Sequence, residues 1–419
     1  MRIQSIISSS VGNVLEWYDF GLFAIYSSLF SQLFFPSHDP HVALLATFGV
    51  FAAGFICRPI GALLFGYFGD KRGRVETLRL SVLMISLPTL LIGFLPTYSQ
   101  IGIFAPLLLT VIRLWQGISL GGEHSGNIIY LAESAPVKHR AVITSLGGTG
   151  ANLGILLASI VGGLSSYFFT DAEFKAWGWH LPYLVSGILC LLIYAVRLKM
   201  QETRVFVQLQ KEHQIAENPI KVMVKDNLPY VLRTLGLVCM GSTYYYFCFI
   251  YIPLFLTENS HQSVFKTSSL MMFFMAAMLV LVPLAGAICD RVGRRKMLLF
   301  NAAFIAIIIV PGFYLVAHSY LISAIWVMSV LTIGSSLEQG ATSIAVVENY
   351  PVPARYTGLS FGYNVGNGFF GGTLPLVCEW LRYKTQIALA PAMYIVVCAL
   401  ITGSVVFFFT KETRHKSLL

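Results

Sequence analysis

Long apolar runs recur along the whole chain, and they limit its fold more than any other feature. Of the 419 residues, 56% are hydrophobic and only 11% are charged. A helix needs about 20 apolar residues to cross about 30 Å of hydrocarbon, and it satisfies its own backbone hydrogen bonds there. The sequence therefore predicts an all-α membrane protein with twelve transmembrane helices, at 9–34, 42–68, 77–95, 102–132, 141–168, 180–198, 229–256, 265–289, 297–317, 320–347, 356–380 and 388–410.

The basic residues gather on one side of these predicted spans. Most of the 28 Lys and Arg residues fall in loops on the side that carries both termini, while Arg58 and Arg113 lie within spans. Loops rich in Lys and Arg stay in the cytoplasm, so both termini are expected there. The net charge of +9 is therefore attributed to the basic cytoplasmic loops of a membrane protein, and no nucleic-acid partner is expected.

Two short motifs occur once in each half of the chain. The motif G-x-x-x-D-x-x-G-R occurs at 66–74 and 286–294, and E-x-x-P-x-x-x-R occurs at 133–140 and 348–355. Their order and spacing are nearly the same in both halves, which indicates an internal repeat. The predicted domains are a six-helix half at 1–198, a cytoplasmic connector with a short amphipathic helix at 199–228, and a second six-helix half at 229–419.

Five longer segments resemble the metabolite:proton symporters of the major facilitator superfamily. They are GNVLEWYDFG (12–21), RPIGALLFGYFGDKRGR (58–74), RLWQGISLGGEHSG (113–126), WGWHLPYL (177–184) and RYTGLSFGYNVGNGFFGGTLPL (355–376). The resemblance implies the major facilitator fold and proton-coupled import across a bacterial inner membrane by alternating access. The implied solute bears a carboxylate: a zwitterion of the proline/betaine type first, and an organic acid such as a dicarboxylate, citrate or shikimate second.

Three features depart from the pattern of the proline/betaine type. His180 stands where many relatives carry Arg, and Arg113 stands where the proline/betaine type carries Lys. The chain ends at Leu419 without the long C-terminal coiled coil of the osmosensing members. This last difference argues against an osmosensing role.

Two other functions on the same fold stay open at this point. A proton-driven exporter of drugs or metabolites would need a wide apolar cavity and would not need Arg113, whereas a non-transporting nutrient sensor would bind without uptake. An enzyme is not expected, because no nucleophile, base and orienting group occur together. The seven cysteines lack metal-ligand spacing and no Walker motif occurs, so no metal and no cofactor are expected. The expected partners are a small-molecule solute, protons and the lipid bilayer, with no obligate protein partner.

The repeated loop motifs supply a candidate gate. Their aspartates can accept hydrogen bonds from N–H groups at the end of a neighbouring helix, and their arginines can pair with nearby acids. Such contacts would form when the cytoplasmic side closes; the alternative is that they only anchor the topology. The expected gate residues are Asp70, Arg74, Glu133, Arg140, Asp290, Arg294, Glu348 and Arg355.

Two carboxylates lie inside the first predicted span, one helical turn apart. Glu16 and Asp19 share a helix face with Asn13. An ionisable side chain in hydrocarbon is costly, so it marks a functional site by default. Asp19 lies deeper and is expected to carry the coupling proton in preference to Glu16. The alternative is a structural ion pair, with Arg58 as the partner of Glu16.

The fourth predicted span concentrates buried polarity on one face. At helical spacing this face consists of Arg113, Gln116, His124 and Asn127. Arg113 is expected to anchor a substrate carboxylate through its bidentate guanidinium; the alternative is an internal pair with Asp19 or Glu123. Glu123 and His124 are further candidates for proton coupling, although a single core histidine more often has a structural hydrogen bond.

Further candidate substrate contacts come from aromatic and amide side chains. Aromatic faces hold quaternary ammonium groups, which suggests a cage of Tyr244 and Trp115, unless these rings only mark the membrane interface. Buried amides contact substrates or join helices. The expected substrate-binding residues are Arg113, Gln116, Trp115, Tyr244, Glu338, Gln339, Asn364 and Asn367.

Overall fold

The computed structural model describes residues 3–259, 264–318 and 320–418, and every regular element among them is helical. The first half holds α1 (Ile3–Ile25), α2 (Ser27–Phe34), α3 (Pro40–Lys71), α4 (Arg74–Gly93), α5 (Tyr98–Ile101), α6 (Phe104–Ser134), α7 (Arg140–Phe168), α8 (Asp171–Glu173) and α9 (His180–Arg197). The connector holds α10 (Arg204–Lys211) and α11 (Pro219–Lys225). The second half holds α12 (Leu228–Tyr246), α13 (Ile252–Asn259), α14 (Val264–Val292), α15 (Arg294–His318), α16 (Tyr320–Glu348), α17 (Arg355–Gly366), α18 (Leu374–Thr385) and α19 (Ala390–Phe409).

The helices follow the predicted spans closely. Among the described residues, nine helices are long and apolar enough to cross a membrane by length and composition. The other three predicted spans are helical as well: 9–34 corresponds to α1 with α2, 320–347 to α16, and 356–380 to α17 with α18. The sequence pattern of long apolar runs therefore located the helices well.

Three π-helical segments among the described residues were not predicted. They cover Phe174–Gly178 between α8 and α9, Phe247–Tyr251 directly after α12, and Asn367–Gly372 between α17 and α18. A π-helical turn inserts an extra residue into the helix, and such turns are frequent at functional sites. Apolar periodicity does not reveal a one-residue insertion, which explains why the sequence did not indicate them.

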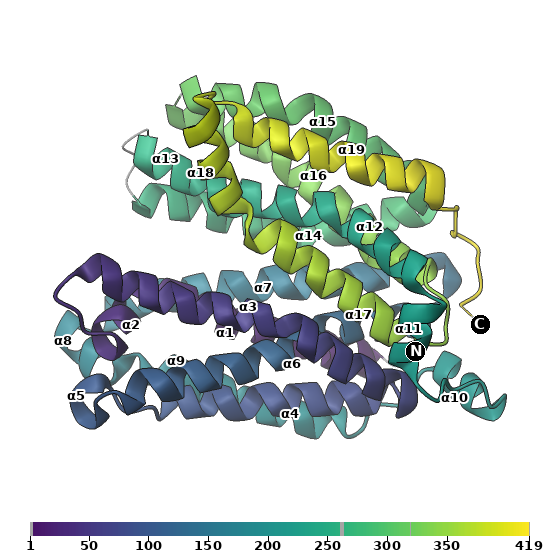
Figure 1. Ribbon diagram of the computed structural model, residues 1–419, viewed down its shortest axis with the longest axis horizontal. Coiled ribbons are helices and arrows are strands. Elements are labelled where there is room, and N and C mark those ends of the chain that lie inside the picture. The colour runs from purple at the N-terminus through teal and green to yellow at the C-terminus, as the bar shows by residue number, and fades with distance from the viewer. Residues whose placement is uncertain (1–2, 260–263, 319, 419) are drawn as a thin grey trace.

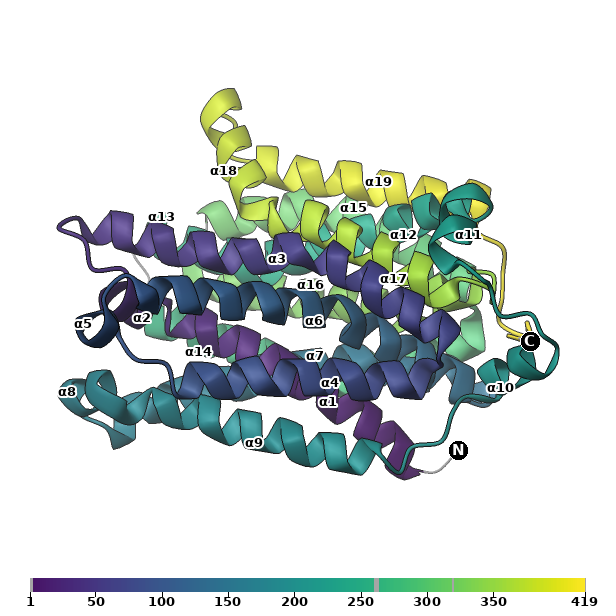
Figure 2. The same ribbon diagram turned by 60° about the horizontal axis from the view of Figure 1, so that its bottom comes forward.

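The two halves lie side by side with their helices roughly parallel (Figure 1). They contact each other through α7 against α14 and through α3 against α17. Both chain ends and the connector helices α10 and α11 lie at one end of the molecule, called here the termini end (Figure 2). The short helices α5 and α8 lie at the opposite, distal end.

The connector contains two short helices where the sequence predicted one. In α10, Val205, Phe206 and Leu209 are buried while the remaining side chains face outward. The Thr203 hydroxyl caps α10 by accepting from the N–H of Phe206. This amphipathic helix attaches the connector to the termini end of the first half.

Glycines bring α6 into backbone contact with α3. A Cβ at Gly117 would collide with the carbonyl oxygen of Gly54, and a Cβ at Gly121 would collide with that of Arg58. Small residues at this spacing let membrane helices approach closely. The close approach fixes the rotation of α6, whose polar face is thereby directed toward α1.

Candidate transport site

Asp19 lies at the centre of a buried polar cluster in the first half. Its Oδ2 accepts from Nη1 of Arg113 at 3.1 Å and from Nε2 of Gln116 at 3.0 Å, and its Oδ1 accepts from Thr89 at 3.2 Å. The Arg113 guanidinium also lies 3.9 Å from the ring centroid of Phe23. Both charged groups are buried. The internal pair with Asp19, stated above as the alternative for Arg113, is thus present in the structure.

The rest of the α6 polar face also contacts α1. Nδ1 of His124 lies 3.2 Å from Oδ1 of Asn13, and Asn127 accepts from Ser9 at 2.5 Å. The predicted common face of this stripe is therefore confirmed. Asn13 in turn donates to the carbonyl of Gly147 on α7, which ties α1 to a third helix.

Glu16 is held more loosely than Asp19. Its Oε1 lies 3.9 Å from Nη2 of Arg58, which is the predicted contact. Glu16 is fully buried, and neither carboxylate oxygen has a hydrogen-bond partner among the described residues. The Arg58 guanidinium is also 5.5 Å from the ring centroid of Trp17, so its charge is shared between the acid and an aromatic face.

Glu123 pairs with Arg197, which lies at the end of the predicted span 180–198 and whose charge was counted with those of the loops. Arg197, in the last turn of α9, is fully buried and donates from Nη1 to Glu123 at 2.9 Å. Ser81 donates to the same carboxylate at 2.5 Å, and the carbonyls of Ser8 and Ser9 accept from Arg197. An Arg at the end of an apolar run is usually one of the basic residues that flank a span on the cytoplasmic side. The sequence therefore did not indicate that Arg197 is buried and pairs with Glu123.

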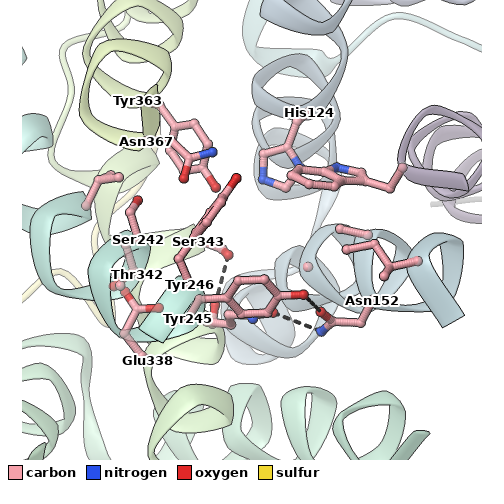
Figure 3. Close-up of a pocket in the computed structure, with 17 residues that line it drawn as sticks. His124, Asn152, Ser242, Tyr245, Tyr246, Glu338, Thr342, Ser343, Tyr363 and Asn367 are labelled. Carbon is pink, nitrogen blue, oxygen red and sulfur yellow. Dashed lines mark hydrogen bonds between the residues drawn. The ribbon is translucent and has the colours of Figure 1, made fainter. Parts of the chain in front are cut away.

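A cavity of about 90 Å³ lies between the two halves (Figure 3). This is room for about three water molecules. Its walls come from α1, α6 and α7 of the first half and from α12, α16 and α17 of the second. The polar and aromatic residues that line it are Trp17, His124, Asn152, Ser242, Tyr245, Tyr246, Glu338, Gln339, Thr342, Ser343, Tyr363 and Asn367.

A chain of hydrogen bonds crosses the cavity from one half to the other. Tyr245 donates to Oδ1 of Asn152 at 3.2 Å, and Nδ2 of Asn152 donates to Oε1 of Gln339 at 3.1 Å. Figure 3 shows these bonds as dashed lines. Sequence reasoning missed Asn152, although an amide inside a Gly-rich apolar span was a usable signal. Any motion that separates the halves at the cavity has to break this chain.

Several predicted polar contacts lie away from the cavity. Arg113 and Gln116 face Asp19, and Asn364 donates to the carbonyl of Gly121 at 3.0 Å, which makes it a link between helices. Among the predicted substrate contacts, the cavity is lined by Glu338, Gln339 and Asn367.

The predicted aromatic cage is not assembled. Tyr244 is fully buried and donates to the carbonyl of Leu331, and Trp115 is absent from the described cavity lining. The neighbouring Tyr245 and Tyr246 line the cavity instead. Successive residues of a helix point about 100° apart, so a one-residue difference decides which ring reaches the cavity.

At the termini end, the first group of predicted gate residues forms a closed cluster. Arg74 lies 3.1 Å from Glu133 and 3.4 Å from Asp70, all in the first half. Arg355 of the second half lies 2.9 Å from the same Glu133. One carboxylate thus accepts from an arginine of each half.

The second group repeats this arrangement with the halves exchanged. Arg294 lies 2.9 Å from Glu348 and 3.2 Å from Asp290, all in the second half. Arg140 of the first half lies 3.0 Å from Glu348. The eight predicted gate residues therefore form two matched clusters, and each is completed by an arginine from the other half.

The two aspartates of these clusters hold helix ends of the opposite half. Asp70 accepts from the N–H groups of residues 356–357 at 3.0 and 2.9 Å, in the first turn of α17. Asp290 accepts from those of residues 141–142, both at 3.0 Å, in the first turn of α7. A helix N-terminus favours negative charge, so each aspartate attaches its own half to the other.

A third repeated sequence, Glu-Thr-Arg, was missed. It starts at Glu202 and again at Glu412, after the last span of each half. Each threonine donates to the clustered glutamate of its own half at 2.7 Å. Glu202 accepts from the N–H of Val75 and Glu412 from that of Arg294, both at 3.0 Å. Burial raises the pKa of the Glu202 carboxyl, which these hydrogen bonds partly offset. The repeat itself was the signal that could have revealed these residues.

Comparison with known proteins decides the family. The family model described as Major Facilitator Superfamily matches residues 18–376. The chain belongs to the major facilitator superfamily. The predicted family and fold class are therefore confirmed, and the protein is a membrane transporter by family.

Two relatives cover the whole chain. The inner membrane metabolite transport protein YhjE of Escherichia coli (strain K12) is 33% identical over 430 residues, covering 100% of this chain and 96% of that protein. The proline/betaine transporter of the same organism is 31% identical over 425 residues, covering 99% of this chain and 84% of that protein.

A solved structure of the same superfamily has the same fold. The proton:xylose symporter XylE, bound to 6-bromo-6-deoxy-D-glucose, superposes with a TM-score of 0.80 at 16% sequence identity. The match covers 99% of this chain and 97% of XylE. At this identity the likeness concerns the fold alone.

Neutralising either cluster aspartate should favour opening at the termini end. An Asn in place of Asp70 or Asp290 loses the charge that two N–H groups of the opposite half now share. Charge-assisted hydrogen bonds contribute about 1.5–3 kcal/mol, so the closed form should lose about 10- to 100-fold in population. Reaction of a cysteine introduced at Ala141 with a membrane-impermeant thiol reagent, at the termini end, measures the change.

The exposed Glu76 is a matched control, because it belongs to the same loop region and pairs only loosely with Arg72 at 3.9 Å. Glu76→Gln should leave the reaction rate unchanged. If Asp70→Asn and Asp290→Asn behaved like this control, the two aspartates would not hold the halves together.

Removing Arg197 alone should destabilise the fold, and removing Glu123 with it should restore stability. Arg197→Gln leaves a buried carboxylate without its cation, which costs about 3–5 kcal/mol. The double variant Arg197→Gln, Glu123→Gln removes both charges and should regain most of that loss. Thermal unfolding in detergent measures both. A single variant as stable as the wild type would show that this pair does not support the fold.

Proposed function

We propose that the protein is a proton-coupled symporter that imports a small carboxylate-bearing solute by alternating access. The observation that carries this proposal is the cavity between the halves, combined with two matched ion-pair clusters at the termini end. Among the described residues, ion pairs join the two halves at this end alone. In this proposal the termini end faces the cytoplasm, as the basic loops predict, and the clusters are its gate. Their ion pairs must break before the cavity can open toward the cytoplasm.

The proposed coupling site is Asp19 with Arg113. Ionised Asp19 accepts three hydrogen bonds and holds Arg113 away from the cavity. Protonation would remove the negative charge and release the Arg113 guanidinium, which could then bind a substrate carboxylate. Arg113 thereby has both of the roles considered for it: it is the internal partner of Asp19 while Asp19 is ionised, and it anchors the substrate once Asp19 is protonated.

The proposed solute is a zwitterion of the proline/betaine type. Support comes from the relative named proline/betaine transporter and from the polar, aromatic lining of the cavity. An organic acid is the second candidate, because the relative YhjE is named only as a metabolite transporter. The cavity of about 90 Å³ is small, whereas a drug exporter would need a wide one.

Uptake by proteoliposomes tests this proposal directly. Labelled glycine betaine, proline, succinate, citrate and shikimate would each be offered with and without an imposed inward proton gradient. The proposal predicts accumulation of glycine betaine or proline above equilibrium only with the gradient. Uptake that stops at equilibrium even with the gradient would contradict it and would support a uniporter. Binding of these solutes without any uptake would contradict it and would support a sensor.

Neutralising Asp19 should separate coupling from exchange. Asp19→Asn cannot bind and release a proton, so gradient-driven accumulation should fall to the level of empty liposomes. Solute exchange under equal concentrations should survive, because it needs no net proton movement. The exposed Asp171, neutralised as Asp171→Asn, serves as the control and should retain both activities. Gradient-driven accumulation by Asp19→Asn would exclude Asp19 as the coupling site.

A further inference from the structure

Glu338 differs from every other buried carboxylate in the described part of the chain. Each of the others lies within ion-pair distance of an arginine: Glu16, Asp19, Asp70, Glu123, Glu133 and Glu348. Glu338 is only 6% exposed and has no such partner among the described residues. The Thr342 side chain lies one helical turn along α16 and lines the same cavity.

The carboxylate of Glu338 faces the cavity, and the packing of α12 fixes its place. Glu338 is the one acidic residue in the described cavity lining, which contains no Lys or Arg. A Cβ at Gly241 would overlap all three atoms of the Glu338 carboxylate group, so α12 can pack this closely against Glu338 only with a glycine at this position. His124 lies on the opposite wall (Figure 3), where it contacts Asn13. The cavity therefore has a carboxyl group at one side, with no lysine or arginine among its described lining residues.

Aromatic rings and neutral polar groups complete the cavity. Trp17, Tyr245, Tyr246 and Tyr363 line it together with Glu338. Aromatic faces attract organic cations, and a carboxylate nearby adds a direct charge interaction. This combination suits an ammonium group and repels a second carboxylate.

We infer that Glu338 is the counter-ion for the cationic group of the transported solute. It thereby selects zwitterions and organic cations and rejects organic anions. A buried carboxylate without a partner is unfavourable, so a solute that supplies the missing cation gains affinity. The inference rests on the proposed transport function and adds to it the residue that decides between the two candidate solute classes.

Two ligands of the same shape and different charge test this inference. Glycine betaine has a trimethylammonium group where tert-butylacetate has an uncharged tert-butyl group, and both have the same carboxylate. Affinities would be measured by displacement of labelled glycine betaine from purified protein in detergent. The wild type should bind glycine betaine at least tenfold more tightly than tert-butylacetate, and succinate should compete poorly.

Replacing the carboxylate should remove this preference. In Glu338→Gln the affinity ratio of glycine betaine to tert-butylacetate should fall to about one, while Glu338→Asp, which keeps the charge, should retain part of it. The control Glu379→Gln changes an acid that pairs with Arg382 at 3.2 Å on α18, outside the cavity lining, and should keep the wild-type ratio. Thermal unfolding checks that each variant is folded. The ratio of the wild-type affinities for glycine betaine and tert-butylacetate tests the inference even if Glu338→Gln does not fold.

Several outcomes would overturn the inference. A wild-type ratio near one, or an unchanged ratio in folded Glu338→Gln, would show that Glu338 does not recognise the cation while leaving the transport proposal intact. A Glu338→Gln variant that keeps the ratio but loses gradient-driven accumulation would make Glu338 a proton site instead. If the wild type bound succinate or citrate and not glycine betaine, the proposed solute class would be wrong as well.

Discussion

A charge buried in an apolar membrane protein needs a partner, and the whole structure depends on this requirement. An isolated carboxylate in such surroundings is strongly disfavoured, whereas a carboxylate paired with an arginine and further donors is tolerated. In the first half, the pair of Asp19 with Arg113 joins α1 to α6, and the pair of Glu123 with Arg197 joins α6 to α9. The charged residues therefore act as fixed points that set how the helices of this half pack.

At the termini end the same requirement joins the two halves. Glu133 and Glu348 each accept from one arginine of their own half and from one of the other. The partner from the other half is lost when the halves separate, while the partner from the same half remains. A cluster of this kind can open without leaving its glutamate unpaired, which suits the proposed gate, whose contacts would form and break in each transport cycle.

Local sequence patterns predicted the helices and the repeated clusters, because both depend on short-range information. Apolar run length located the spans, and the repeated motifs supplied all eight cluster residues. Three-dimensional partners were harder to predict. Arg113 could have faced a substrate, and Arg197 looked like a loop residue, because spacing along one helix does not say which side chain a neighbouring helix presents. Tyr244 and Tyr245 were likewise indistinguishable until the rotation of α12 was known.

We propose that the two ends of the molecule open in opposition, because the ion-pair clusters hold the termini end closed. Paired spin labels on opposite halves test it, with one pair at Lys71 and Arg291 and the other at Tyr98 and Tyr383, all exposed positions. Distances would be compared between the wild type and the double variant Glu133→Gln, Glu348→Gln. We expect a longer distance at the termini end and a shorter one at the distal end in the double variant. Unchanged distances, or distances that lengthen at both ends, would contradict it.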